Sequence, residues 1–470
     1  MNFKGISYYL SLFCFPISIL SFINILYSSY FDYFLSINSY IIALILSFLI
    51  SLALFFIGKK TVKKINFIEQ LILIILVYLL VSFFIALPFY LSNYQVTFLN
   101  SYFEAISGIT GTGFSIFKNI RYLDPTLILW RSSSQWLGGL YFLFFLILIF
   151  SNKQFNYKMN DLTYSGDGNI NSESNIKDLL LKIFILYSVS SLVIFLFLNI
   201  SGIRMFNSLN LSMSLISLGG FLPTNSLERI IKSNPQKLIL IFSLLISMLN
   251  FFLILNIFQK RIIIRDHKED LYLVLISFIF ILLVHLSGYS GLDIVISVLS
   301  SLSNSGLSLM SSNNNLSLFF ILITVVGGSL ISNSSGIKFT RIYILLKTVF
   351  AEIIKLVSPN SIINKSIFNS EKKITDENIK ISFLIFISFF ISLFILSGIL
   401  IFDNIDFEKS FKLSILTITN TTTSAMFGME SMDFINLLTT SKLSMIMFMI
   451  IGKIELISIF LIIKKIFFKD

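Results

Sequence analysis

Long apolar runs separated by short polar stretches extend along the whole sequence. Ten of these runs are long enough to cross about 30 Å of hydrocarbon as α-helices. They cover residues 6–28, 38–58, 68–92, 126–151, 178–200, 236–259, 270–288, 316–350, 380–402 and 441–468. The pattern therefore predicts an all-α polytopic membrane protein with ten transmembrane helices.

A shorter kind of segment recurs between the third and fourth, fifth and sixth, seventh and eighth, and ninth and tenth runs. Each of these four stretches is half apolar, too short to span a membrane, and ends in Gly, Ser, Thr or Asn. The order of span, short stretch and span thus occurs four times, and such a repeat outranks local patterns when a fold is assigned. We expect two extra N-terminal helices in residues 1–66, then four pseudo-fourfold helix–pore-loop–helix repeats in 67–152, 176–260, 261–356 and 380–470, with cytoplasmic loops at 153–175 and 357–379.

Composition and charge agree with a membrane protein. The chain is 56% hydrophobic and only 13% charged, which leaves too little polar surface for a soluble globule. The basic residues behind the net charge of +11 lie mainly in loops on one side of a ten-helix count, as the positive-inside rule requires, so we expect no nucleic-acid partner. These loops and both chain termini would be cytoplasmic, and the four short stretches would face outward.

Motifs typical of soluble enzymes are absent from the sequence. It contains no GxxxxGK[ST] phosphate loop and no HExxH, and the spans hold no recognisable nucleophile and base pair. We therefore expect no enzyme and no nucleotide-binding domain within this chain. His285, alone on an apolar segment, is expected to be packed or bonded to a carbonyl group rather than to be a ligand.

The four short stretches can be aligned on the residue before a Phe, Leu or Ala. They read Ile109-Thr110-Gly111-Thr112-Gly113-Phe114, Leu215-Ile216-Ser217-Leu218-Gly219-Gly220-Phe221, Leu302-Ser303-Asn304-Ser305-Gly306-Leu307 and Asn420-Thr421-Thr422-Thr423-Ser424-Ala425. This register places Gly113, Gly220, Gly306 and Ser424 at one position. A one-residue shift would bring Gly428 nearer to that position.

Four equivalent stretches between spans favour a shared cavity over four ordinary loops. Irregular backbone at membrane depth is tolerated only where it is buried in protein or lines water. Carbonyl oxygens around such a cavity can replace the hydration shell of a potassium ion, and the negative C-terminal ends of short helices favour a cation. The candidate cation-binding residues are Thr110, Gly111, Thr112, Gly113, Leu218, Gly219, Gly220, Asn304, Ser305, Gly306, Thr422, Thr423 and Ser424.

Three segments carry a family resemblance. Trp130-Arg131-Ser132-Ser133-Ser134-Gln135-Trp136-Leu137-Gly138-Gly139 resembles a family signature, and Glu104–Gly108 and Gly219–Phe221 are similar to the first and second pore stretches. On these residues the chain resembles the Trk/Ktr/HKT superfamily of potassium transporters over nearly its whole length, and most closely the TrkH branch. The resemblance implies potassium uptake through one central pore, with Gly113, Gly220 and Gly306 as selectivity-filter glycines and a potassium ion bound there in transit. It also implies a homodimer in the bacterial inner membrane and a TrkA-like cytoplasmic nucleotide-binding regulatory subunit.

Two polar features interrupt the apolar spans. The eighth run contains Gly327-Gly328-Ser329-Leu330-Ile331-Ser332-Asn333-Ser334-Ser335-Gly336-Ile337-Lys338, which predicts either a kinked helix or, by resemblance, an intramembrane gating loop. Lys453 lies near the middle of the last run, where a cation is costly unless it faces a cavity. Gly452-Lys453 resembles the family's Gly-Arg motif, which forms an electrostatic barrier. The gate candidates are Gly327, Gly328, Ser329, Ser334, Ser335, Gly336, Lys338 and Lys453.

Two departures from the family pattern leave alternatives open. Ser424 stands where the other three stretches have glycine, and Lys453 replaces an arginine, which keeps the charge but loses the planar fork. A sodium-permeable or sodium/potassium transporter of the same fold is therefore one alternative. A polytopic flippase or exporter for lipid-linked sugars is another, and it predicts neither the fourfold repeat nor a charge at the level of Lys453.

Overall fold

The computed structural model describes residues 2–33, 37–59, 65–150, 173–258, 268–310, 316–359, 366–369, 373–429 and 432–454. The regular structure of these residues is helical, apart from one isolated β-bridge between Ser366 and Lys373. Residues 153–172 of the expected cytoplasmic loop lie outside the described residues. The part of the last expected span from residue 455 onward also lies outside them.

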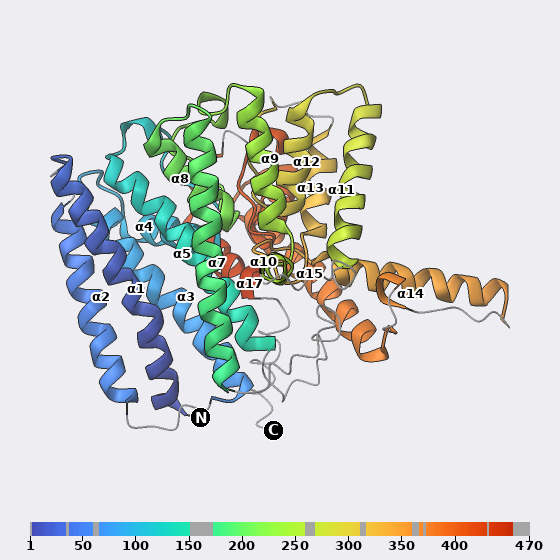
Figure 1. The fold of residues 1–470 in the computed structure, drawn as a ribbon, viewed down its shortest axis with the longest axis horizontal. Coiled ribbons are helices and arrows are strands. Elements are labelled where there is room, and N and C mark those ends of the chain that lie inside the picture. Colours follow the sequence, from blue (N-terminus) through green and yellow to red (C-terminus); the bar gives the residue numbers. More distant parts are fainter. Residues whose placement is uncertain are drawn as a thin grey trace.

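Two N-terminal helices, α1 (Phe3–Tyr30) and α2 (Ile37–Gly58), pack along each other at one side of the molecule (Figure 1). The Asn2 side chain caps α1 by accepting a hydrogen bond from the Gly5 amide at 2.9 Å. Gly58 permits the close approach of the two helices, because a Cβ there would lie 2.6 Å from the Tyr8 Cβ. The first expected unit of the fold is thus a tight helical pair.

Four repeats follow, and each contains a long helix, a short helix of 12 or 13 residues, and a returning helical segment. The first is α3 (Phe67–Tyr90), α4 (Phe98–Thr110) and α5 (Pro125–Phe150); the second is α7 (Glu173–Ile200), α8 (Met205–Ser217), α9 (Asn234–Met248) and α10 (Phe251–Phe258); the third is α11 (Lys268–Leu286), α12 (Leu292–Ser303), α13 (Ser317–Val326) and α14 (Phe339–Val357); the fourth is α15 (Asp376–Phe402), α16 (Phe407–Ile418) and α17 (Thr439–Ile454). The described parts of the connections contain the 3₁₀ turns η2 (Ile120–Tyr122), η3 (Leu227–Arg229), η6 (Ile367–Asn369) and η7 (Ala425–Phe427).

The repeats close into a ring through one recurring contact. The returning helix of each repeat packs on the short helix of the next: α5 on α8, α9 on α12, and α13 on α16. The last repeat completes the cycle, because α17 packs on α4 of the first. The four short helices are therefore held around a common centre.

Helix starts in the repeats follow local capping chemistry. The Asn66 amide donates to the Glu69 carboxylate at 2.8 Å, and these residues form a capping box at the start of α3. Ser233 and Gln236 form the same device at the start of α9. These polar residues end the loops and set the entry points of the apolar helices.

The number of unbroken spans is smaller than the expected ten. In the described part of the chain, seven helices are long and apolar enough to cross a membrane, and an eighth span exists if α9 and α10 count as one bent pair. The run expected at 316–350 is not one helix, because α13 ends at Val326 and α14 begins at Phe339. α17 has 16 residues in the described region and ends where that region ends. The ten-helix count thus stays a prediction.

The two broken runs are joined to each other. The chain bends by 103° between α9 and α10. The polar loop that connects α13 to α14 is hydrogen-bonded to this bend. The Ser329 amide donates to the Met248 carbonyl at 3.1 Å, and the Phe251 amide donates to the Ile331 carbonyl at 3.0 Å. Backbone groups freed at both breaks thereby satisfy one another, as buried irregular backbone requires.

Helix α14 departs from the bundle. In Figure 1 it runs across the direction of the other long helices and extends sideways beyond them. Many of its apolar side chains are exposed, including Leu346, Phe350 and Leu356. This helix therefore presents apolar surface away from the ring of short helices.

Candidate functional site

Three of the short helices end at a C-cap residue with a left-handed backbone, and in the fourth, α16, the left-handed residue comes one place after the C-cap Thr419. These residues are Gly111 (φ 76°), Leu218 (φ 57°), Asn304 (φ 66°) and Asn420 (φ 49°). Two residues further on, the first three repeats have a second left-handed residue, and it is a glycine each time: Gly113 (φ 76°), Gly220 (φ 74°) and Gly306 (φ 71°). Glycine adopts this conformation at the lowest steric cost, which favours it at these three positions.

The fourth repeat has Thr422 at the corresponding place. Hydroxyl pairs fix the register, because Thr110 and Thr112 lie 2.8 Å apart (Oγ1–Oγ1) and Thr419 and Thr421 lie 2.9 Å apart in the same way. One residue beyond each pair comes Gly113 in the first repeat and Thr422 in the fourth. Counting from the left-handed residue at Asn420 gives the same answer.

The alignment of Ser424 with the three glycines is therefore wrong by two residues. That alignment used the residue before a Phe, Leu or Ala, but α16 stops at Ile418 and its turn is formed by Thr419 and Asn420. Ser424 instead precedes the 3₁₀ turn η7 and has an extended backbone. Gly428 lies beyond that turn, as its C-cap, and is no closer match.

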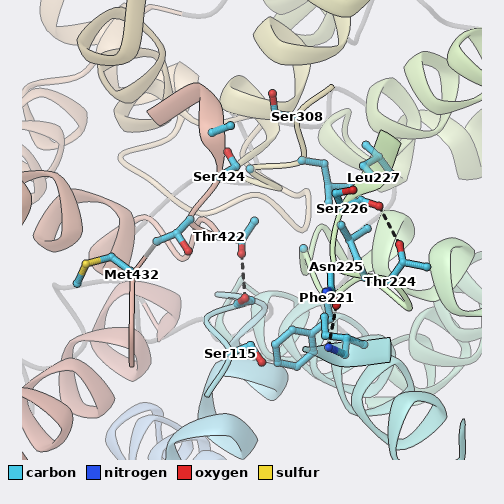
Figure 2. A pocket seen from close by; sticks show the side chains of 18 of the residues that line it. Ser115, Phe221, Thr224, Asn225, Ser226, Leu227, Ser308, Thr422, Ser424 and Met432 are labelled. Carbon is cyan, nitrogen blue, oxygen red and sulfur yellow. Dashed lines mark hydrogen bonds between the residues drawn. The ribbon is translucent and has the colours of Figure 1, made fainter. Parts of the chain in front are cut away.

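The Thr422 side chain lies among the three glycines. Its hydroxyl donates a hydrogen bond to the Gly113 carbonyl at 2.8 Å, which Figure 2 shows as a dashed line. A Cβ built on Gly113 would lie 2.9 Å from the Thr422 Cβ, and Cβ atoms built on Gly220 and Gly306 would each lie 2.7 Å from its Cγ2. One threonine side chain thus lies against the equivalent glycine of all three other repeats.

A cavity of about 730 Å³ opens above this point (Figure 2). Its wall includes residues that follow all four short helices, among them the three glycines, Thr422, Thr423 and Ser424. The other candidate cation-binding residues, Thr110, Gly111, Thr112, Leu218, Gly219, Asn304 and Ser305, are not part of this wall, and all of them except the two glycines are buried side chains. The cavity thus brings together six of the thirteen candidate residues, from all four repeats.

An ion pair between two repeats lies in the wall of the cavity. Lys118 Nζ and Asp433 Oδ2 are 2.5 Å apart and join the first repeat to the fourth. Partial burial acts to raise the pKa of Asp433, but the hydrogen bond and charge of Lys118 outweigh it and hold that pKa below its ordinary value. Asp433 is therefore ionised at neutral pH, and the pair is formed.

Residues of the Trp130–Gly139 segment brace the irregular chains. The Gln135 amide nitrogen donates to the Gly219 carbonyl, and its oxygen accepts from the Phe221 amide at 3.1 Å. Sequence reasoning missed this role, although Gln135 was part of the quoted segment. A buried amide side chain among serines on an otherwise apolar helix was the available signal, because such a group needs partners.

The polar loop between α13 and α14 is a compact unit. Gly327 (φ 71°) and Gly336 (φ 80°) turn the chain at its two ends, and the Gly328 amide donates to the Ser334 hydroxyl at 2.9 Å. The Lys338 ammonium closes the loop through the carbonyl groups of Ser329 (3.3 Å), Ser332 (3.2 Å) and Ser334. The predicted gate residues of this loop therefore contact one another.

Lys453 connects this loop to the short-helix centre. Its Nζ donates to the Asn333 carbonyl at 3.0 Å and lies 3.4 Å from the Ser335 hydroxyl. It also lies 4.4 Å from the centroid of the Phe142 ring and 3.8 Å from where a Cβ of Gly111 would be. The ammonium group is thus buried directly below the ends of the short helices, beside the loop.

Acidic metal ligands are not gathered anywhere in the described residues, which contain no group of three or more His, Cys, Asp or Glu. The oxygen atoms at the centre are carbonyl and hydroxyl groups, which suit a weakly held alkali cation. His285 is bonded to the Tyr289 carbonyl through Nδ1 at 3.1 Å, as the sequence predicted.

The chain was compared with known proteins. No protein-family model matches it. An uncharacterized cation transporter of Methanocaldococcus jannaschii is 24% identical over 414 residues, covering 84% of this chain and 82% of the relative. The Trk system potassium uptake protein TrkG of Escherichia coli is 25% identical over 463 residues, covering 92% of each chain. The TrkH protein of Salmonella typhimurium is 22% identical over 424 residues, 86% of each.

A solved structure gives the fold. The potassium transporter TrkH from Vibrio parahaemolyticus matches with a TM-score of 0.85 over 98% of both chains, at 17% sequence identity. The predicted resemblance to the TrkH branch is confirmed in fold and in distant sequence similarity. The similarity is to transporters and not to enzymes.

Proposed function

We propose that this TrkH/TrkG-like membrane subunit takes up potassium and related alkali cations through one pore, on the axis of its four short helices. The observation that carries the proposal is the closed ring of short helices whose ends carry left-handed turns at Gly111, Leu218, Asn304 and Asn420. Helix C-termini direct negative potential toward the centre, and carbonyl and hydroxyl oxygens there can replace a hydration shell. The names of the relatives agree with this function.

We assign the gate to the loop 327–338 together with Lys453. A buried ammonium group below the short helices opposes the passage of any cation. Because Lys453 is bonded to Asn333 of the loop, a displacement of the loop would move both the obstruction and the charge. Conduction would require this displacement.

We also infer the orientation, location and partners. The basic loops favour cytoplasmic termini in a bacterial inner membrane, with lipid around the bundle and the cavity above Thr422 open to the outside. We keep the predicted domain boundaries at 66, 152, 175, 260, 356 and 379 as a proposal, although α7 begins at Glu173 and α15 at Asp376, each a few residues before its predicted boundary. The exposed apolar side chains of α14 suit a homodimer, and the basic inner side suits a TrkA-like nucleotide-binding regulatory subunit.

A second candidate of the same fold is a sodium-permeable transporter, and Thr422 among the filter glycines favours it. The lipid-linked sugar flippase is disfavoured, because it predicted no fourfold repeat and no charge at the level of Lys453.

Cation flux into proteoliposomes tests the proposal. Purified protein should admit labelled rubidium or sodium down a gradient, with a regulatory subunit and nucleotide added where basal flux is low. Flux should exceed that of empty liposomes and should fall when excess unlabelled potassium or sodium competes. Flux of neither cation under these conditions would contradict the proposed function.

A further inference from the structure

We propose that Asp433 is an outer binding site for the incoming alkali cation, and that the Lys118 ammonium group occupies this site as a built-in competitor. The inference rests on the proposed function, because the cavity that both residues line is the outer entrance of the proposed pore. It concerns the capture of a cation before the filter, and involves neither the filter residues nor the gate.

The carboxylate of Asp433 is held in a fixed place at the cavity wall. Its Oδ2 accepts a hydrogen bond from the Asn436 side-chain amide at 2.7 Å. The next residue, Phe434, stacks on the Phe114 ring with 4.8 Å between the ring centroids, and Phe114 directly follows Gly113. The segment that carries the carboxylate is therefore packed against the first filter stretch, at the entrance of the proposed pore.

Among the described residues, four charged side chains line this cavity: Lys118, Arg131, Glu228 and Asp433. Arg131 is buried and paired with Glu104. Glu228 is exposed, so water and salt screen its attraction for a cation. Asp433 keeps only 29% of its side chain exposed, and a partly buried charge is screened less. Asp433 is thus the carboxylate best placed to hold an ion.

The Lys118 ammonium group stands where such an ion would bind. Its Nζ lies 2.5 Å from Asp433 Oδ2, and 63% of the Lys118 side chain is exposed. Exposed ion pairs contribute little to stability, because water competes for both partners. The pair therefore opens and re-forms readily, and each opening leaves the carboxylate accessible to a cation from outside.

The backbone around Lys118 is anchored on both sides. Two residues earlier, the Ile116 amide donates to the Glu104 carboxylate at 2.8 Å. Two residues later, the Ile120 amide donates to the Asn225 side chain at 2.8 Å. The Lys118 side chain can thus leave Asp433 without displacing the segment, and a tethered group returns at a high effective concentration. Lys118 would therefore set the cation concentration at which the site fills.

The test measures the rubidium concentration that gives half-maximal flux in proteoliposomes. Lys118→Gln removes the competitor and should lower this concentration by about threefold with maximal flux unchanged. Asp433→Asn removes the site and should raise it by about threefold. The double variant should resemble Asp433→Asn, because no carboxylate remains for the cation. A double variant with the value of the unchanged protein would show that only net charge at the entrance matters, and would overturn the inference.

Lys237→Gln is the matched control. Lys237 and Asp293 form another ion pair between two repeats, with Nζ 2.7 Å from Oδ1, but neither residue lines the cavity. The half-maximal rubidium concentration of this variant should equal that of the unchanged protein. An equal fall in Lys237→Gln and Lys118→Gln would assign the effect to general surface charge and contradict a site at Asp433.

A second measurement needs no transport. A cation that displaces Lys118 from Asp433 frees the Lys118 amino group for reaction with an acylating reagent. Labelling of Lys118, followed by mass spectrometry, should therefore be faster in rubidium chloride than in N-methylglucamine chloride at the same ionic strength. Equal labelling in the two salts would overturn the inference. Absence of flux in every variant would refute the proposed function, whereas the labelling would still decide whether Asp433 binds a cation.

Discussion

The guanidinium group of Arg131 lies 2.8 Å from the carboxylate of Glu104 (Nε–Oε1), and both side chains are buried. The carboxylate also accepts from the Ile116 amide at 2.8 Å, while the guanidinium carbon lies 4.1 Å from the centroid of the Phe221 ring. This pair therefore links the first short helix to the chain beyond Gly113 and to the chain beyond Gly220. One buried ion pair thus contacts the irregular chain of two repeats.

Glu104→Gln should destabilise the protein by about 3–5 kcal/mol, because it leaves the Arg131 charge buried without its counter-ion. Thermal or denaturant-induced unfolding of the detergent-solubilised protein measures this loss of stability. Cation flux should fall with it, since the chain beyond Gly113 loses its anchor. Glu352→Gln is the control: Glu352 and Lys355 form an exposed pair, and exposed pairs contribute about 1 kcal/mol or less. Equal stability of the two variants would show that the buried pair has no special structural role.

Lys453→Met should raise basal cation flux. The substitution keeps an unbranched side chain of similar length but removes the charge below the short helices and the bonds to the loop at Asn333 and Ser335. Lys453→Arg retains the charge and should keep basal flux near that of the unchanged protein. Rubidium uptake without any regulatory subunit measures both variants. A fall in uptake by folded Lys453→Met would mean that the ammonium group assists conduction rather than opposing it.

Much of this arrangement could be predicted from the sequence because it is encoded in simple patterns. Apolar runs give the spans, and their order gives the repeats. The glycines at 113, 220 and 306 mark left-handed turns that few other residues adopt. Sequence reasoning also grouped the polar residues of 327–338 correctly as one interruption of a span.

The parts that could not be predicted depend on contacts between distant residues. The fourth repeat has no glycine at the place equivalent to Gly113, so its register could be fixed only by the turn at Asn420 and the hydroxyl pair of Thr419 and Thr421. The bend between α9 and α10 has no proline, and it exists because the loop at Ser329 supplies hydrogen-bond partners. The hydropathy pattern alone predicts one continuous span at 236–259 and does not define the register of the fourth repeat.

Glu269→Ala should loosen the loop between α13 and α14. The Glu269 carboxylate, at the start of α11, accepts from the Leu330 amide at 2.9 Å and from the Thr340 hydroxyl. The adjacent Asp270 accepts from the Asn250 amide at 3.0 Å, so two neighbouring carboxylates fasten both broken spans. Removing one of them leaves a buried amide without its partner, at a cost of about 1–3 kcal/mol.

Two measurements test the role of the Glu269 carboxylate. Thermal stability of Glu269→Ala should fall, and basal rubidium flux should rise because the loop is held less firmly. Glu377→Ala, in the exposed first turn of α15, is the control and should change neither by much. Lower stability with unchanged flux would place Glu269 in the scaffold only and separate it from the gate.

Gly138→Ala and Gly398→Ala should have opposite effects on stability. A Cβ on Gly138 of α5 would overlap the Ile109 carbonyl near the end of the first short helix, and a Cβ on Gly452 of α17 would overlap the equivalent Ile418 carbonyl of the fourth. Close approach of the returning helix is therefore built into both repeats. Overpacking at such a contact costs about 1–3 kcal/mol and should also reduce flux by displacing Gly111 and Gly113.

A Cβ on Gly398 of α15 meets nothing within 4 Å, so alanine there should stabilise the helix by about 0.5–1 kcal/mol with flux unchanged. Melting curves of both variants in the same detergent decide the point, and a stable, fully active Gly138→Ala would show that the short helix tolerates displacement without loss of the pore.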